Sequence, residues 1–425
     1  MPVPVKKTPM LADRLNQWLD HILAQPWVYA IFAFLAIRPS QLLDLDEQLF
    51  GALPIFRCII YVGFTLALLS YAVRWCTSAI QRKNPTFLCI LLLFLWLDAV
   101  TLLYQGASGY HIYWHSGFML MMLLDMGLQR ERESTLCGIT LALEGWIYLN
   151  LLSLFAFPGG MITVDPLSPE WILGSRAIYY RIVFPAVALL LIRQHVLGKK
   201  WRVRTAISLA ACVLTVALQR GGTGLIGFAL LLALMLFCYK RALPRYLTPL
   251  TFTLIALLVF LGIHFFRLHY AFEWLISSVL HKSMTLSNRT DIWEQAMTLI
   301  FKNPVTGVGL LPVAYISPLL GGYAHTHNQL LELMLHGGFV ALGLYFAALY
   351  FVSREAIAHR RSAAVKTAAL LLIAFAFMGV SEMFHNEPLY YALFVLLSRA
   401  DALALDAKPL PRISLKKRLA RDLKK

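Results

Sequence analysis

The chain has 425 residues, of which 59% are hydrophobic and only 14% charged, whereas a soluble domain has roughly 45–50% apolar and about 25% charged residues. This composition, with a mean hydropathy of +0.67, excludes a soluble globular enzyme, a disordered chain and a disulfide-stapled secreted module. The 38 Lys and Arg residues exceed the 22 Asp and Glu residues and give a formal net charge of +16. In so apolar a chain, that excess indicates membrane topology and contacts with anionic membrane lipids, not with nucleic acid.

Apolar runs long enough to cross a membrane recur along the whole chain, because a span needs about 20 mainly apolar residues. About twelve runs fit this requirement, at residues 26–43, 52–73, 86–104, 111–128, 136–157, 177–192, 205–219, 223–239, 247–266, 329–352, 367–380 and 388–405. They predict an all-α integral membrane protein with spans at 26–266 and 329–405. Residues 1–25 precede the spans, and a basic tail at 406–425 follows them.

The basic residues fall mostly at alternate connections between the spans. The N-terminal segment with Lys6 and Lys7, the connection at 193–204 and the tail at 406–425 are all strongly basic. Because basic connections stay in the cytoplasm, we expect both termini there and the protein in the cytoplasmic (inner) membrane. The longest hydrophilic connection, residues 267–328 between the ninth and tenth spans, is then extracytoplasmic.

This long loop contains its own helical pattern. Apolar side chains recur at helical spacing from Asn288 to Phe301, which predicts an amphipathic helix lying across the membrane surface and ending at Asn303-Pro304. A shorter outer connection at 158–175 has the Pro and Gly pattern of an irregular loop.

Asp98 and Glu144 are acidic residues that lie within predicted spans. A charged side chain is costly in hydrocarbon, so we expect both to face the protein interior. There they serve either as a proton path in a transporter or as buried hydrogen-bonding groups, and we favour the second interpretation.

An arginine followed by a glycine pair marks the boundary between two predicted spans. Arg220 lies in QRGGTG at the predicted outer face. A guanidinium can donate two parallel hydrogen bonds to a phosphate, and a helix starting after Gly221-Gly222 leaves backbone N–H groups free for an anion. These features fit a pyrophosphate headgroup. The alternative is an arginine that snorkels to the interface beside a flexible turn.

Two further candidates lie in the long outer loop. Arg289, in NRTDIW, either binds an anion or pairs with a neighbouring acid such as Asp291. His325 and His327, in AHTHN, lie where the loop enters the next span. An exposed imidazole there can take a proton from a sugar hydroxyl, because histidine titrates near neutral pH. The alternatives are a zinc site, which lacks nearby Cys or carboxylate partners, and a polar turn without chemistry.

In order and spacing, these segments resemble the O-antigen ligase and polymerase family. The resemblance spans roughly residues 205–350 and rests on LTVALQRGGTGLIGFAL, NRTDIWEQAMTLIFKNPVTGVGL and HTHNQLLELMLHGGFVALGLYF. It implies a GT-C-like membrane glycosyltransferase that moves a glycan from undecaprenyl pyrophosphate to an acceptor at the outer face. A ligase would use lipid A-core as the acceptor, and a polymerase would use another lipid-linked chain.

By motif position, the resemblance implies that Arg220 and Arg289 bind the pyrophosphate and that His327 is the catalytic base. It implies further substrate contacts at Arg176, Arg181, His325 and Asn328. Pyrophosphate is a good leaving group that guanidinium groups can stabilise, so we expect inversion without a metal or other cofactor. The alternative of another class is a polysaccharide or lipid-linked sugar transporter, whose internal symmetry or continuous polar path is not evident in the sequence.

Overall fold

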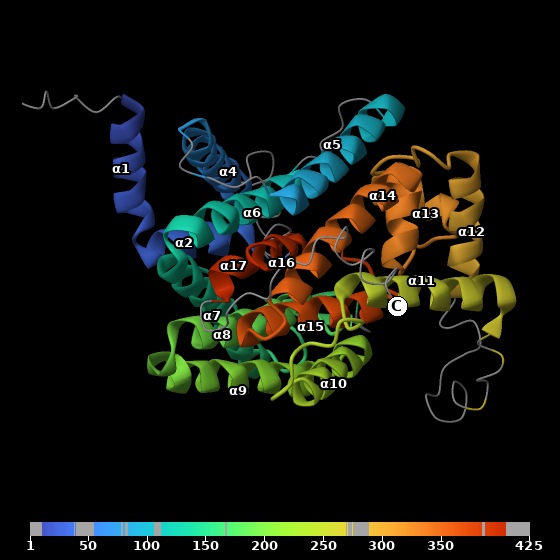
Figure 1. Cartoon of the computed structure of the whole chain (residues 1–425). Helices are drawn as coiled ribbons and strands as arrows, with labels where there is room; N and C mark the ends of the chain where they lie inside the picture. Colours follow the sequence, from blue (N-terminus) through green and yellow to red (C-terminus); the bar gives the residue numbers. More distant parts are fainter. Residues whose placement is uncertain are drawn as a thin grey trace, which may run out of the picture.

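The computed structural model describes residues 11–37, 39, 55–77, 80, 84–105, 112–165, 168–268, 270, 274, 289–384 and 387–404. These residues form a bundle of helices with one small sheet (Figure 1). The first elements are α1 (Leu11–Leu23), α2 (Pro26–Ala36), α4 (Ile55–Cys76), α5 (Pro85–Gln105), α6 (Ile112–Arg130), α7 (Arg132–Ala156), β1 (Ile162–Asp165), β2 (Ser168–Trp171) and β3 (Gly174–Ser175). They are followed by α8 (Tyr180–Leu197), a 3₁₀ turn (Lys199–Trp201), α9 (Arg202–Gln219), α10 (Gly222–Phe237), α11 (Pro249–Phe266), α12 (Arg289–Lys302), α13 (Val313–Leu319), α14 (Gln329–Ala358), α15 (Ala363–Met378), α16 (Pro388–Ser398) and α17 (Ala400–Leu403).

Seven of the described helices are long and apolar enough to cross a membrane, and an eighth span results if the bent pair Asp13–Leu23 and Pro26–Ala36 is counted as one. Three shorter apolar helices, α10, α15 and α16, accompany them. The prediction of a multi-pass, all-helical membrane protein is therefore confirmed. The described helices of full spanning length are fewer than the twelve predicted runs, because α10, α15 and α16 are shorter than a span needs. α16, for example, has 11 residues and extends only about 16 Å.

The two short C-terminal helices lie inside the bundle. α15 contacts α8, α10, α11 and α14, and nearly all of its residues are buried. Alanines such as Ala368, Ala369 and Ala374 are fully buried, and their small side chains allow the neighbouring helices to approach closely. The hydrophobic run of α15 thus forms a helix in the core of the protein.

The connection at 158–175 is not irregular, so that prediction is wrong. Its three strands form an antiparallel sheet in the order β1-β2-β3, with Glu170 paired to Ile162 on one side and to Ser175 on the other. The buried Trp171 holds the sheet on α7, because its Nε1 donates to the Phe157 carbonyl at 2.8 Å. The strands are too short for an alternating pattern to stand out against the Pro and Gly residues.

Glu144 faces the protein interior as predicted. It is 1% exposed, and its carboxylate pairs with Arg193 at 2.9 Å and with Arg204. Asp98 is half-buried. A third acid within a helix, Asp125, is fully buried and pairs with Arg399 at 2.6 Å. These pairings provide the compensation that a buried charge requires.

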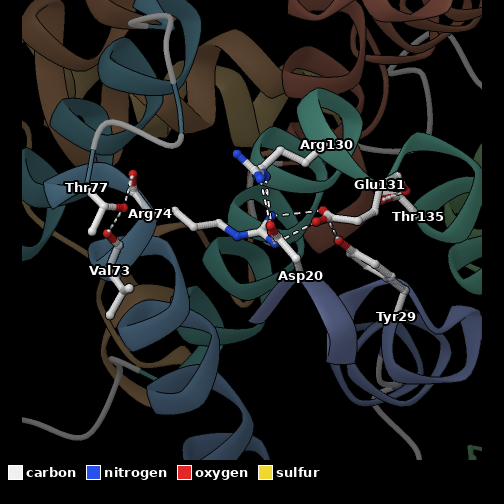
Figure 2. A network of polar contacts seen from close by, with 8 residues as sticks. All are labelled: Asp20, Tyr29, Val73, Arg74, Thr77, Arg130, Glu131 and Thr135. Carbon is white, nitrogen blue, oxygen red and sulfur yellow. Dashed lines mark hydrogen bonds and ion pairs between the residues drawn. The ribbon is translucent and has the colours of Figure 1, made fainter. Parts of the chain in front are cut away.

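A second charged network joins α1, α4 and the turn between α6 and α7 (Figure 2). The fully buried Arg74 contacts Asp20 at 3.0 Å and Glu131 at 2.7 Å. Arg130 also contacts Asp20, at 2.7 Å, and the Tyr29 hydroxyl donates to Glu131 at 3.3 Å. Because removing one partner would leave a buried charge uncompensated, this network fixes how the N-terminal helices meet.

The helix predicted in the long loop is present as α12, and in Figure 1 it runs across the direction of α11. Its apolar side packs on protein, and its position at the membrane surface stays a prediction. Trp293 and Ala296 are buried against α11 and α14, and the Trp293 ring meets Phe260 of α11 edge-on at 5.1 Å. Helical periodicity shows that a helix has an apolar face but not what that face contacts.

α14 is broken at Gly338, where φ is +62° and ψ is −159°. The loop at 303–309 packs into the break and supplies hydrogen bonds that the interrupted helix lacks. These bonds run from Val308 N to Leu335 O (2.8 Å), from Gly309 N to His336 O (2.9 Å) and from Phe339 N to Pro304 O (2.9 Å). The Asn-Pro…Gly-x-Gly segment and the glycine pair of α14 thus meet each other and hold the start of α14 in place.

Candidate functional site

His327 lies in the turn that leads into α14. Its φ is +52°, a left-handed conformation that is uncommon for residues other than glycine. The residue before it, Thr326, is fully buried, and its carbonyl accepts a hydrogen bond from Trp293 Nε1 at 2.9 Å. The residue after it, Asn328, caps α14 by accepting from the backbone N–H groups of Leu330 and Leu331. The imidazole therefore stands between two anchored neighbours.

The start of α14 also holds the connection between α15 and α16. Three hydrogen bonds do so, from Gln329 N to Gly379 O (2.8 Å), from Asn328 Nδ2 to Val380 O (3.0 Å) and from Phe384 N to Gln329 Oε1. This connection carries Glu382, which is only 7% exposed. The turn that presents His327 is thus tied directly to the segment that presents Glu382.

Glu382 joins side chains from three other elements. Its carboxylate lies 3.8 Å from Arg181 of α8 and 3.4 Å from Arg289 of α12, and it accepts a hydrogen bond from Thr223 of α10 at 3.4 Å. Arg181 also pairs with Glu387 at 2.9 Å. Burial raises the pKa of Glu382, although Arg181 and Arg289 act in the opposite direction. The buried carboxylate of Glu382 thus holds two guanidinium groups in fixed positions beside each other.

The two histidines of the turn pack against each other, with ring centroids 4.0 Å apart. Burial, followed by the neighbouring His325 and the cation of Arg289, lowers the pKa of His327 to about 3. Its Nδ1 makes no hydrogen bond within the described part of the chain. His327 is therefore a neutral imidazole at physiological pH, which is the form that accepts a proton.

Arg220 ends α9 in a left-handed conformation, with φ at +50°. Its side chain is exposed, and its Nε donates to the Ala217 carbonyl at 3.4 Å. The following Gly221 lies against the backbone carbonyl of Arg176, so that an added Cβ would stand 1.9 Å from that oxygen. The turn is thus packed tightly on the segment before α8, and Thr223, in the first turn of α10, connects it to Glu382.

We expect Gly221→Ala to reduce protein stability, because the new methyl group must displace the Arg176 backbone. Overpacking of this kind typically costs about 1–3 kcal/mol. The matched control is Gly222→Ala, since a Cβ at that position meets nothing within 4 Å. Thermal denaturation of the purified variants checks the prediction, and equal midpoints for the two would contradict it.

The structure brings most of the predicted site residues to one place. His325, His327, Arg289 and Arg181 act on one another electrostatically, and the turn of Arg220 and Arg176 adjoins them. The polar atoms of the Asn328 side chain are engaged inside the protein, so its geometry indicates a positioning role; a substrate contact there stays a prediction. Among the described residues there is no group of three or more His, Cys, Asp or Glu side chains arranged to hold a metal ion.

Sequence analysis did not single out the acids of this site, Glu382, Glu387 and Glu332. The position of Glu382 and Glu387 in the sequence could have identified them, because both lie in the short connection between two predicted spans on the outer side. Glu332, one turn into α14, has no local pattern that separates it from an ordinary helix residue.

A comparison with protein families finds a match that covers part of this site. Residues 205–346 match a family model described as O-antigen ligase, whereas no curated protein matches the chain. The match contains Arg220, Arg289, His327 and the break in α14. Arg181 and Glu382 lie outside it and are brought to the site by the fold alone.

Proposed function

We propose that the chain is an O-antigen ligase, a membrane enzyme of glycan transfer, because its residues 205–346 match the O-antigen ligase family model. Its donor is a glycan carried on undecaprenyl pyrophosphate, and its acceptor is lipid A-core. The observation that supports this proposal is the convergence of a neutral histidine, His327, with the guanidinium groups of Arg289 and Arg181 around one buried cluster.

The proposed reaction is a single inverting displacement. His327 takes the proton from the acceptor hydroxyl, whose oxygen attacks the anomeric carbon and forms the new glycosidic bond. The bond from that carbon to the pyrophosphate oxygen breaks on the opposite face, and lipid pyrophosphate leaves with the electron pair. Arg289, Arg181 and Arg220 stabilise the charge that develops on it, which makes a metal ion or a strong general acid unnecessary.

We place this site at the outer face of the inner membrane, with both termini in the cytoplasm. The basic connections support that orientation. The full topology proposed is GT-C-like with about twelve spans, in which α10, α15 and α16 are short crossings. The predicted basic tail at 406–425 lies outside the described residues.

Deletion of the gene in its host tests the function directly. The surface polysaccharide and the undecaprenyl-linked glycans are sized together, and the strain is complemented with wild type or with His327→Ala. Accumulated long lipid-linked chains are the result expected for a ligase. Accumulated single repeats would identify a polymerase of the same family, and unchanged glycans would contradict glycan transfer.

We expect Arg289→Ala to weaken donor binding, because the variant loses a charged hydrogen-bonding group that faces the pyrophosphate. A loss of about 2 kcal/mol corresponds to roughly a thirtyfold rise in Kd. Binding of undecaprenyl pyrophosphate to purified protein measures it. Lys302→Ala is the matched control, since it removes one cation from the far end of the same helix; equal effects would mean that net charge, not the site, binds the donor.

A further inference from the structure

Glu332 is a buried carboxylate one turn into α14 that holds the residue before His327. It is 2% exposed. Its Oε2 accepts hydrogen bonds from the backbone N of Thr326 at 2.7 Å and from the Thr326 hydroxyl at 2.6 Å. Hydrogen bonds to an ionised or strongly polar acceptor are the stronger kind, so these two bonds fix Thr326 firmly.

The other oxygen of Glu332 contacts a histidine on the next turn of the same helix. Oε1 lies 3.0 Å from His336 Nε2, and His336 Nδ1 lies 2.7 Å from the Gly309 carbonyl. A carbonyl only accepts, so Nδ1 carries a proton and donates it. The contact between Nε2 and Oε1 then contains a second proton, on either the imidazole or the carboxyl group. Through this pair, Thr326 is linked to the glycine loop packed into the break of α14.

These contacts bear directly on the backbone of His327. Its left-handed φ of +52° is unfavourable by about 1–2 kcal/mol for a residue with a Cβ. Such a conformation persists when the surrounding structure imposes it. Here Thr326 is held by Glu332 and Trp293, and Asn328 is held by its cap bonds and by Val380. The imidazole has no hydrogen bond of its own at Nδ1 within the described residues, so its direction depends on the backbone that these two neighbours hold and on its packing against the His325 ring.

We propose that the Glu332–His336 pair is a positioning device for His327, which imposes the strained turn and aims the imidazole at the arginine cluster. The proposal rests on the proposed function, in which His327 is the base. Glu332 and His336 bind Thr326 and the Gly309 carbonyl, so they act on His327 through the geometry of the turn, while the charge of Glu332 also raises the pKa of His327. Loss of the pair should therefore lower kcat and leave donor binding intact, because Arg289 and Arg181 belong to other elements.

Steady-state kinetics of purified, reconstituted protein with an undecaprenyl-pyrophosphate glycan donor test the proposal through three variants. Glu332→Ala should lower kcat by roughly tenfold to a hundredfold, the range that follows from misplacing a catalytic group by about 1 Å, with the donor KM within about twofold. Glu332→Gln should stay within about threefold of wild type, because its amide oxygen can accept from Thr326 and its NH₂ can donate to neutral His336. Glu355→Ala, which breaks the similar pair with His359 at the far end of α14, is the matched control and should match wild type.

An unchanged kcat in Glu332→Ala would overturn the proposal, as would a Glu332→Gln variant as slow as Glu332→Ala. If Glu332→Ala does not fold, Thr326→Val decides, because it removes the hydroxyl contacts to Glu332 and to the Asn328 backbone and keeps the backbone bond to Glu332; kcat must still fall at constant KM. Failure of the proposed function gives a different result. In that case the wild type itself transfers no glycan, or His327→Ala remains active, whatever the Glu332 variants do.

Discussion

Replacing His327 with alanine is expected to lower the rate of glycan transfer by about 10²–10⁴-fold, the usual contribution of a positioned general base. The Kd for undecaprenyl pyrophosphate should stay close to that of the wild type, because the guanidinium groups that bind it remain. Transfer assays and donor-binding measurements on the same purified variant check both parts. His359→Ala, which changes a buried histidine at the other end of α14, is the control and should retain full activity.

The pH dependence gives this prediction a second readout. Burial, His325 and Arg289 lower the pKa of His327 to about 3, well below the ordinary value of about 6.5. The base is therefore already deprotonated in the free enzyme, and acidification from pH 8 to about 5 should not remove it. Since kcat/KM reports the ionisations of the free enzyme, it should show no decline near pH 6.5. A decline of kcat/KM near pH 6.5 that disappears in His325→Ala would assign that ionisation to His325 and would contradict His327 as the base.

The lowered pKa of His327 also determines how folding stability changes with pH. Between its lowered folded pKa and its ordinary unfolded pKa, the unfolded chain binds more protons at His327 than the folded chain. Stability from this residue is thus lost as pH falls below about 6.5 and is restored as pH rises. Arg289→Ala should raise the pKa of His327, because one of the cations that lower it is removed.

Gly338→Ala is expected to have the largest effect on folding. At φ +62° and ψ −159° the backbone is in a region that is essentially restricted to glycine. An added Cβ would also lie 2.2 Å from the Val305 carbonyl oxygen and 2.7 Å from the Pro304 carbonyl oxygen. Strain and overpacking together should cost about 3 kcal/mol or more. The loop at 303–309 would be pushed out of the break in α14.

Thermal denaturation in detergent measures this effect, and donor transfer measured on the surviving fraction reports on the site. The matched control lies five residues further along the same helix, where Gly343→Ala places a Cβ that meets nothing within 4 Å. In a helix interior, that change should be neutral or slightly stabilising, by up to about 1 kcal/mol. Equal midpoints for the two alanine variants would show that the break in α14 is not required.

The class of the protein and the position of most helices could be predicted from the chain alone. The predicted runs at 136–157 and 247–266 correspond to α7 and α11, the run at 26–43 begins with α2, and the helix expected from Asn288 to Phe301 is α12. Hydrophobic content and helical periodicity are local properties of the chain, so they can be read without knowing what each helix contacts. The motifs around Arg220, Arg289 and His327 are local in the same sense.

The contacts that those elements make depend on the tertiary structure. The contact between Arg181 and Glu382 joins residues about two hundred positions apart, and the bond from Glu332 to Thr326 depends on a turn that no periodic pattern marks. The apolar face of α12 lies on protein and not on lipid, although the two environments select the same side chains. Charge pairing and the left-handed turn at His327 depend on several distant elements at once, so a linear pattern cannot specify them. The candidate base could thus be predicted from the chain, while the site that orients it is a product of the fold.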